Sequence, residues 1–371
     1  MLSQTFSPVA LRPAECATLE LRGLYERFGY KKYSVSQFEE YGLYLQYRSF
    51  LHGGRMLTFT DLDGRLLALK PDVTISIIKN ARLEPGGVEK AYYIENVYRE
   101  NKTAGTFKEI KQMGLEYLGK VDTYAVAETL MLAQETLRSI GPDWVLELSH
   151  MGFVLGMLKA MQLDEATRRE MLVALAAKSR HGVHSIAKQA GLSEEQSLQI
   201  EALCTLSGRF EDIAEQAQAL CICPEMQDAL QVLKDTVSAL EDTSHIRLDF
   251  TLQGDMDYYD GIMMCGYLEG VPGPVLTGGR YDSLVKKLGK DAGAVGFALY
   301  LDKLERLPCD TGDFDLDYLI LPDADADTAE LLLQVEKLVA TGQRVRVDHI
   351  QPSDLRCKKI CRFTKEGLSE C

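Results

Sequence analysis

Residues 109–118 read EIKQMGLEYL, and this stretch predicts the strand around which the fold is built. Successive side chains of a strand point to opposite faces, so Gln112, Gly114 and Glu116 share one face while apolar residues occupy most of the other. A face of glutamine, glycine and glutamate is a poor core surface. It suits the floor of a polar ligand site, because Gly114 leaves room and its two neighbours supply hydrogen-bonding groups.

A second strand is expected directly upstream, at residues 91–99 (AYYIENVYR). The polar residues 100–108, which include a glycine, separate the two strands and predict a β-hairpin with a long tip. Further upstream, residues 66–69 predict a strand that stops before Pro71, and Asp72 can cap the helix that follows. Hairpin, strand and capped helix together indicate a sheet with helices packed on it.

Further strands and helices are expected around this hairpin. The strands lie at residues 33–35, 144–148, 246–252 and 256–264, and the helices at residues 14–28, 73–81 and 122–139. Residues 152–241 are rich in Ala, Leu, Glu and Gln, which predicts a largely helical block. Because strands resume at His245, we expect this block to be an insert in a domain with a mixed sheet.

The last part of the chain has the order strand, helix, strand, at residues 317–321, 328–339 and 344–347. One unit of this size cannot close a domain alone. We therefore expect it to pack on the rest of the chain or on a partner.

Composition narrows the class of protein. The chain has 371 residues, 46% of them hydrophobic, which is enough to fill a sizeable core. The 41 basic and 55 acidic side chains give a net charge of −14, which disfavours a nucleic-acid partner without excluding a local basic groove. No run approaches the roughly 20 apolar residues needed to cross a bilayer, and residues 1–15 lack the pattern of a signal peptide. We expect a cytoplasmic protein with no membrane contact.

Cysteine and histidine spacing gives no sign of a metal site. The nine cysteines are irregularly spaced, which favours free thiols in a reducing compartment over a disulfide framework. No cysteine cluster brings a histidine at zinc-ligand spacing. His181 and His184 lie three residues apart, but without a fitting acidic or cysteine partner they indicate a solvated helix end. We expect no metal and no cofactor.

Three motifs together carry a family resemblance. Asp257, Tyr258 and Tyr259 follow a strand, residues 278–282 (GGRYD) predict a tight turn into a short helix, and residues 294–298 read AVGFA. In combination they resemble the catalytic core of class II aminoacyl-tRNA synthetases, the histidyl type in particular, over about residues 8–307.

The resemblance implies an α+β fold in which helices flank an antiparallel sheet. We expect a synthetase-like core at residues 1–310, a helical insert at about residues 152–243, and a shortened C-terminal α/β segment at residues 311–371.

The resemblance also implies an amino-acid pocket. Asp72 and Thr74 would meet the α-amino group, and Gln112 and Glu116 the amino and imidazole ends. Arg99 would hold a carboxylate or an α-phosphate, because a guanidinium fork matches such oxygens. The candidate histidine-binding residues are Asp72, Thr74, Arg99, Gln112, Glu116, Tyr258 and Tyr259.

The ATP side departs from the family pattern. Gly254 stands where the family has an arginine that stabilises the reacting charge, and Asp255 adds a negative charge beside it. Thr106 replaces a second ATP-binding arginine, Tyr300 replaces a glycine, and Lys303 replaces an arginine. Losing one cation that acts in the transition state can cost about 3 kcal/mol. Synthetase activity is therefore predicted to be absent, and no catalytic residues are assigned.

A synthetase-like body without synthetase chemistry resembles the regulatory subunits of ATP phosphoribosyltransferase, which are paralogues of histidyl-tRNA synthetases. That resemblance implies a chain that joins a short-form catalytic subunit in a hetero-oligomer, activates it, and lets histidine inhibit it in the first step of histidine biosynthesis. It also implies self-association as a dimer. The tail is expected to be too short for a complete anticodon-binding domain, so tRNA is not an expected partner.

Two other functions remain open. One is a divergent histidyl-tRNA synthetase that still forms histidyl-adenylate. The other is a histidine-binding or tRNA-binding module that acts on a different partner. Whether histidine would occupy the old synthetase pocket or a subunit interface also stays open.

Overall fold

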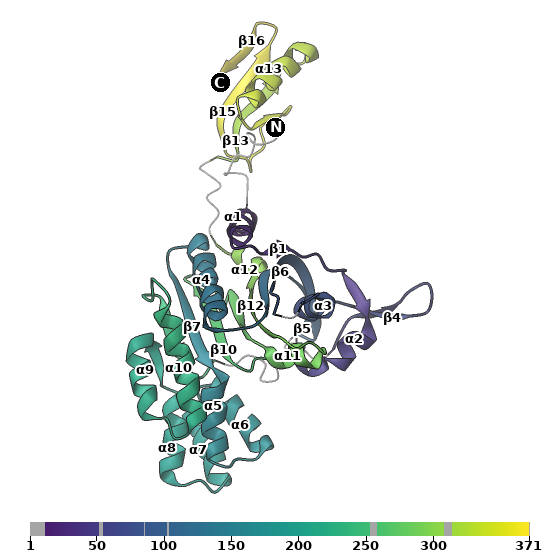
Figure 1. Ribbon diagram of the computed structural model, residues 1–371. Helices are drawn as coiled ribbons and strands as arrows, with labels where there is room; N and C mark the ends of the chain where they lie inside the picture. The colour runs from purple at the N-terminus through teal and green to yellow at the C-terminus, as the bar shows by residue number, and fades with distance from the viewer. Residues whose placement is uncertain are drawn as a thin grey trace. The chain divides into compact units, whose positions relative to one another are not determined.

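The computed structural model describes residues 12–51, 55–84, 86–101, 104–252, 258–307 and 314–370. The chain forms two compact units (Figure 1). One spans Ala17–Leu307, and the other comprises Pro308–Cys371 together with Met1–Cys16.

The larger unit is built on a nine-stranded sheet in the order β1-β5-β6-β12-β11-β10-β7-β9-β8. Its neighbours pair antiparallel except for β1 with β5 and β7 with β9, so the expected antiparallel sheet is confirmed. The strands are β1 (Lys31–Lys32), β5 (Glu89–Asn101), β6 (Thr106–Gly119), β7 (Trp144–His150), β8 (Ser207–Arg209), β9 (Ile246–Asp249), β10 (Ile262–Leu268), β11 (Leu276–Arg280) and β12 (Gly293–Tyr300).

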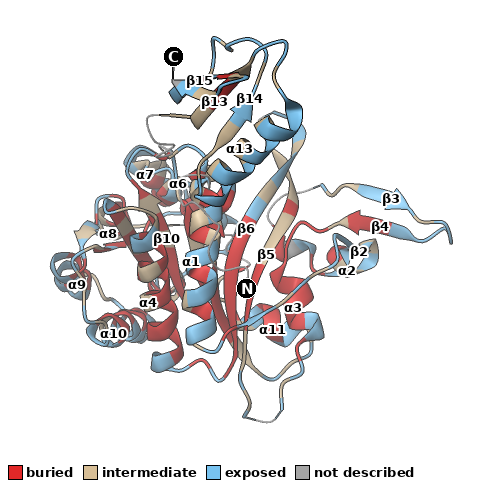
Figure 2. Cartoon of the chain, turned by 90° about the horizontal axis from the view of Figure 1, so that it is seen from above, coloured by how far each residue is buried: buried red, intermediate tan, exposed pale blue. Residues whose placement is uncertain are grey.

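The β5–β6 hairpin has a shorter tip than predicted. Pairing continues to Asn101 opposite Thr106, so most of the residues expected to form a loop belong to the strands. These residues are polar because the outer part of the hairpin is largely solvent-exposed, whereas the last eight residues of β6 are mostly buried (Figure 2). Polarity here reflects exposure on both faces of a strand rather than a turn.

Helices cover both faces of the sheet. α1 (Pro13–Arg27) and α4 (Thr123–Ile140) lie on one face and are joined by a hydrogen bond of 2.8 Å between Tyr25 and Thr136. α4 begins as predicted, because Asp122 accepts a hydrogen bond from the Ala125 amide. The short helices α3 (Thr74–Asn80), α11 (Asp282–Lys287) and α12 (Leu301–Leu304) complete the coverage. Among the helices of the described residues, none is long and apolar enough to span a bilayer.

Six helices fill the stretch between β7 and β9, in agreement with the predicted helical block. They are α5 (Met151–Ala160), α6 (Glu165–Ala176), α7 (Arg180–Gln189), α8 (Glu194–Leu203), α9 (Phe210–Ala219) and α10 (Pro224–Ser238). The prediction that His184 lacks an acidic partner is wrong, because its Nδ1 lies 2.9 Å from a carboxylate oxygen of Glu201 on α8. Sequence spacing could not show this contact, since the two residues come from different helices.

A small three-stranded sheet precedes the hairpin. It has the order β2-β4-β3, with β2 (Phe38–Glu40), β3 (Thr58–Thr60) and β4 (Leu66–Leu69), and lies next to α2 (Tyr41–Gln46) and the 3-10 helix η2 (Arg48–Phe50). The strand predicted at residues 66–69 is confirmed, but the one predicted at residues 33–35 is wrong. Pairing stops after Tyr33, whose amide donates to Tyr92, because the chain then turns away toward β2.

Two predictions near the end of the sheet are corrected. Gly278 and Gly279 lie inside β11 rather than in a tight turn. A Cβ on Gly279 would come within 2.5 Å of the Ile262 carbonyl oxygen and 2.7 Å of the Tyr259 ring, so glycine permits a close approach of neighbouring groups. The strand expected at residues 256–264 begins only at Ile262, and its first two residues lie outside the described part of the chain.

The smaller unit has a four-stranded sheet in the order β14-β13-β15-β16. Its elements are β13 (Leu316–Pro322), α13 (Thr328–Ala340), β14 (Val345–Val347), β15 (Cys357–Thr364) and β16 (Gly367–Glu370). The predicted strand–helix–strand order is confirmed. β15 and β16 were not predicted. In β15 only Cys361 and Phe363 are buried, and the exposed basic residues around them leave too weak an apolar alternation to indicate a strand.

Candidate functional site

The residues predicted to bind histidine lie together around one cavity. The sheet supplies its floor, the start of α3 one wall, and the segment before β10 another. The cavity is small, about 30 Å³, which is the room of one or two water molecules, so a ligand the size of histidine enters only if lining side chains move apart. Its lining includes all seven candidates, namely Asp72, Thr74, Arg99, Gln112, Glu116, Tyr258 and Tyr259.

Glu116 is the buried acid of this pocket. The Thr74 hydroxyl donates to its Oε1 at 2.6 Å, and the Tyr281 hydroxyl donates to its Oε2. Burial raises the pKa of Glu116 from 4.5 to about 8; the two hydroxyl bonds oppose this rise and nearby Asp72 adds to it. The side chain is therefore mostly protonated at neutral pH.

Asp72 and Arg99 form an ion pair in the pocket. Nη2 of Arg99 lies 3.7 Å from Oδ2 of Asp72, and Nε of Arg99 donates to the Pro71 carbonyl at 2.8 Å. The other Asp72 oxygen accepts from the Ile75 amide at 3.0 Å, so Asp72 bonds the first turn of α3 as predicted, although the N-cap position itself is Val73. Among the described residues lining the pocket, Arg99 is the one cation. The backbone thus holds both charges at fixed positions.

Gln112 provides an unused hydrogen-bond donor. The residue is 1% exposed, and its Nε2 has no hydrogen-bond partner within the described part of the chain. A buried amide left unpaired costs about 1–3 kcal/mol. An acceptor oxygen on a bound ligand would satisfy it.

Aromatic side chains enclose the pocket. The ring centroids of Tyr258 and Tyr259 are 4.8 Å apart, and those of Tyr258 and Tyr281 are 5.4 Å apart. Burial raises the pKa of all three hydroxyls well above the usual value of 10. The prediction that Gly114 leaves room for a ligand is wrong, because a Cβ there would lie 2.5 Å from the Tyr93 hydroxyl oxygen. Glycine admits Tyr93 instead.

Several lining residues were not predicted. Tyr93 could have been found from the hairpin register, since it pairs with Gly114 across β5 and β6. Tyr281 was noted in the GGRYD segment but assigned to a turn. The remaining ones are Thr277, Gly296, Phe297, Ala298 and Tyr300, of which the last four lie in segments named in the sequence analysis without being assigned to this pocket.

Among the residues that depart from the synthetase pattern, Tyr300 and Lys303 are neighbours and Thr106 lies apart from them. The Tyr300 hydroxyl and Thr277 Oγ1 are 2.9 Å apart, so the tyrosine occupies the edge of the pocket. Lys303 donates to the Pro274 carbonyl and lies 5.1 Å from the centre of the Tyr300 ring. Thr106 lies at the hairpin tip, opposite Asn101. Gly254 and Asp255 lie outside the described residues, as does Asp257.

The pocket offers hydrogen-bonding groups of both kinds to a small polar ligand. Within the ranges that the structure describes, no group of three or more His, Cys, Asp or Glu side chains could hold a metal ion. The lining combines a protonated acid, an ion pair, a free amide donor and aromatic walls. Such a set can bind a zwitterion that also carries a ring with N–H groups.

Comparison with known proteins gives matches over most of the chain. The family model described as "Histidyl-tRNA synthetase" matches residues 4–304. An ATP phosphoribosyltransferase regulatory subunit from Desulfitobacterium hafniense (strain Y51) is 28% identical over 348 residues, which cover 92% of this chain and 88% of the relative. A histidine–tRNA ligase from Methanoregula boonei is 27% identical over 318 residues, covering 81% and 73%.

Solved structures share the fold. An ATP phosphoribosyltransferase regulatory subunit/histidyl-tRNA synthetase from Bacillus halodurans C has a TM-score of 0.76 at 22% identity and covers 95% of this chain and 96% of its own. A chain of the ATP phosphoribosyl transferase (HisG:HisZ) complex from Thermotoga maritima has a TM-score of 0.60 at 15% identity, covering 76% and 96%. With its class II synthetase-like α+β fold, the chain belongs to the histidyl-tRNA synthetase family.

Proposed function

We propose that this chain is a non-catalytic regulatory subunit that joins and activates a short-form ATP phosphoribosyltransferase. In this proposal histidine binds the chain and inhibits the complex, which performs the first step of histidine biosynthesis. Relatives named as such regulatory subunits support the assignment, as does the fold shared with a chain of the Thermotoga maritima complex.

The pocket around Glu116 is the observation that carries the proposal. A histidine imidazole would donate to a carboxyl oxygen of Glu116, while Asp72 and Thr74 would accept from the α-amino group. Arg99 would meet the α-carboxylate, and so would Gln112 in place of the expected amino end, because its unpaired atom is the donor Nε2. The α-amino group, the α-carboxylate and one imidazole nitrogen of histidine then each have a partner of the right kind.

Residues on the ATP side support the absence of synthetase chemistry. Tyr300 and Lys303 are already engaged with Thr277 and the Pro274 carbonyl, respectively. Lysine cannot reproduce the planar fork of the arginine that the family places at this position. Gly254 stands where the family has the arginine that stabilises the reacting charge, so little is left to neutralise the charge of a reacting nucleotide.

Feedback then requires coupling between the pocket and the partner's active site. A coupling free energy of about 1–3 kcal/mol changes an affinity by roughly 5- to 150-fold. Coupling is reciprocal for binding, so histidine should also change the affinity of the chain for its catalytic partner.

Reconstitution tests the proposal directly. We expect a short-form catalytic subunit to gain activity when the purified chain is added, and the mixture to lose activity when histidine is added. Glu116→Ala should preserve the activation and remove the inhibition, because the imidazole loses its acceptor. If Glu116→Ala keeps full inhibition, histidine binds at an interface instead.

The same preparation separates the competing functions. Robust histidine-dependent exchange of pyrophosphate into ATP by the chain alone would show a divergent histidyl-tRNA synthetase. A chain that binds histidine but neither associates with nor activates the catalytic subunit would be a module for another partner.

A further inference from the structure

A second cavity lies along the outer face of α4, the helix that packs on the sheet through its other side. Its volume is about 770 Å³, within the range of sites that hold ligands or peptide segments. Its lining comes from three parts of the chain: α4, the residue that follows α1, and the segment that follows α10.

One stripe of α4 forms the floor. Tyr124, Ala127, Met131, Gln134 and Arg138 recur every three or four residues, so they lie in a row along the helix. From Tyr124 to Arg138 the row is about 21 Å long at 1.5 Å per residue. The cavity is therefore a groove that follows the helix axis, and we call it the α4 groove.

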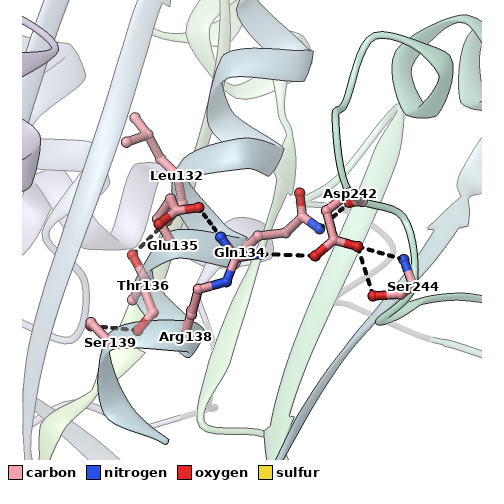
Figure 3. Close-up of polar contacts among 8 residues, drawn as sticks. All are labelled: Leu132, Gln134, Glu135, Thr136, Arg138, Ser139, Asp242 and Ser244. Carbon is pink, nitrogen blue, oxygen red and sulfur yellow. Dashed lines mark hydrogen bonds and ion pairs between the residues drawn. The ribbon is translucent and has the colours of Figure 1, made fainter. Parts of the chain in front are cut away.

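The wall after α10 is fixed to this floor. Gln134 Nε2 donates to the Asp242 carbonyl at 2.8 Å, and Arg138 reaches the Asp242 carboxylate at 3.0 Å while it also bonds Glu135 (Figure 3). Ser244 donates its amide and hydroxyl hydrogens to the same carboxylate. These bonds hold the segment against the helix, so the groove exists before any partner arrives.

The floor of the groove is apolar at Ala127 and Met131, and carboxylates lie around it. Four carboxylates line it, on Glu128, Glu135, Glu241 and Asp242. Two cations bond to them, Lys90 to Glu128, and Arg138 to Glu135 and Asp242, which leaves two negative charges in excess among the described residues. Such a groove repels phosphate and nucleic acid and attracts lysine and arginine.

We propose that the α4 groove docks a basic amphipathic helix of the catalytic subunit. An apolar stripe on that helix would pack on Ala127 and Met131, and flanking lysine or arginine side chains would meet the acidic rim, as in other helix-in-groove complexes. The occupant follows from the length of the groove and the sign of its charge. Its identity as the catalytic subunit rests on the proposed function.

Calorimetric titration of the full chain with a short-form catalytic subunit tests this docking. Glu241→Lys reverses an exposed rim charge, and Met131→Arg adds bulk and positive charge to the floor. We expect the double variant to bind the catalytic subunit at least about tenfold more weakly, and Glu241→Lys alone to reduce the dependence of Kd on salt. Glu170→Lys, on the exposed face of α6, makes the same charge change outside the groove and should bind like wild type.

Each other result contradicts the proposal in a different way. Wild-type affinity in the double variant would exclude the groove while leaving the proposed function intact. Equal weakening by Glu170→Lys would show a general effect of net charge. Absence of any wild-type complex would refute the proposed function, and this occupant with it. Because Glu241 is exposed, its substitution tests the charge effect even if Met131→Arg perturbs folding.

Discussion

Gly296 of β12 lies opposite Glu116 of β6 in the sheet register, and a methyl group on Gly296 would overlap the Glu116 carboxylate. The acid is therefore positioned from two sides. Thr74 and Tyr281 bond its two oxygens, and the missing side chain of Gly296 gives them space. Gly296, inside strand β12, thus has a steric role at the binding site rather than a conformational one.

Gly296→Ala should press on the Leu115 carbonyl and expel the Glu116 carboxylate from its position. We expect a loss of unfolding free energy of about 2 kcal/mol from overpacking, and a loss of histidine binding measured by calorimetry. Gly23→Ala on α1 is the matched control, because a Cβ there meets nothing within 4 Å. That control should be neutral or stabilising. Normal histidine affinity in Gly296→Ala would refute the steric role.

Glu116→Gln should change how stability depends on pH. The pKa of Glu116 is raised by burial from 4.5 to about 8, so the acid stabilises the fold fully below pH 4.5 and this contribution is lost as pH rises to about 8. Glutamine does not titrate. In urea unfolding, the unfolding free energy of the variant should rise relative to that of wild type by about 1.4 kcal/mol for each unit of pH increase in this window. Glu170→Gln, exposed on α6, should give a constant difference, and a flat difference for Glu116→Gln would contradict the assigned burial effect.

Periodic segments could be predicted because their signals are local. The alternation in residues 109–118 defines the faces of β6 without knowledge of its neighbours, and Asp122 marks the start of α4 through a bond to an amide three residues on. The seven pocket residues were found because family motifs supplied their roles. The structure then brings them around one cavity.

Features that depend on distant neighbours could not be predicted. Gly278 and Gly279 suggest a turn when taken alone, but their purpose is to admit Tyr259, Phe297 and other groups that lie close to β11. The space above Gly114 belongs to Tyr93, which only the pairing register of the adjacent strand could have shown. In the sequence, Gly278, Gly279 and Gly114 look the same whether they make room for a ligand or for another group of the protein.

Gln112→Met should separate stability from binding. Removing a buried, unpaired amide should leave stability unchanged or raise it by about 1 kcal/mol, whereas histidine affinity should fall about tenfold because the carboxylate loses a donor. Gln134→Met on α4 is the matched control. Its Nε2 already donates to Asp242 at 2.8 Å, so the same substitution should lower stability by about 1 kcal/mol. Destabilisation of similar size in both variants, seen in urea melts, would mean that Gln112 has a structural partner.

His150→Asn should remove a source of acid instability. His150 ends β7, and its Nδ1 accepts a hydrogen bond from the Gly152 amide at 3.1 Å, which caps α5. Burial, with a smaller effect from the charge of Arg280, lowers the pKa of this imidazole from 6.5 to about 4. The folded protein therefore keeps the ring neutral, while the unfolded chain takes up a proton as pH falls below 6.5.

The stabilisation from neutral His150 is complete above pH 6.5 and is lost as pH falls to about 4. Asparagine retains a capping acceptor without titrating. As pH falls from 6.5 to about 4, the unfolding free energy of His150→Asn should therefore rise relative to that of wild type by about 1.4 kcal/mol per pH unit. His181→Asn, at an exposed position of α7, should follow the wild-type curve. Parallel curves for His150→Asn and wild type would contradict this account. They would show that the imidazole takes up its proton equally well in the folded and the unfolded state.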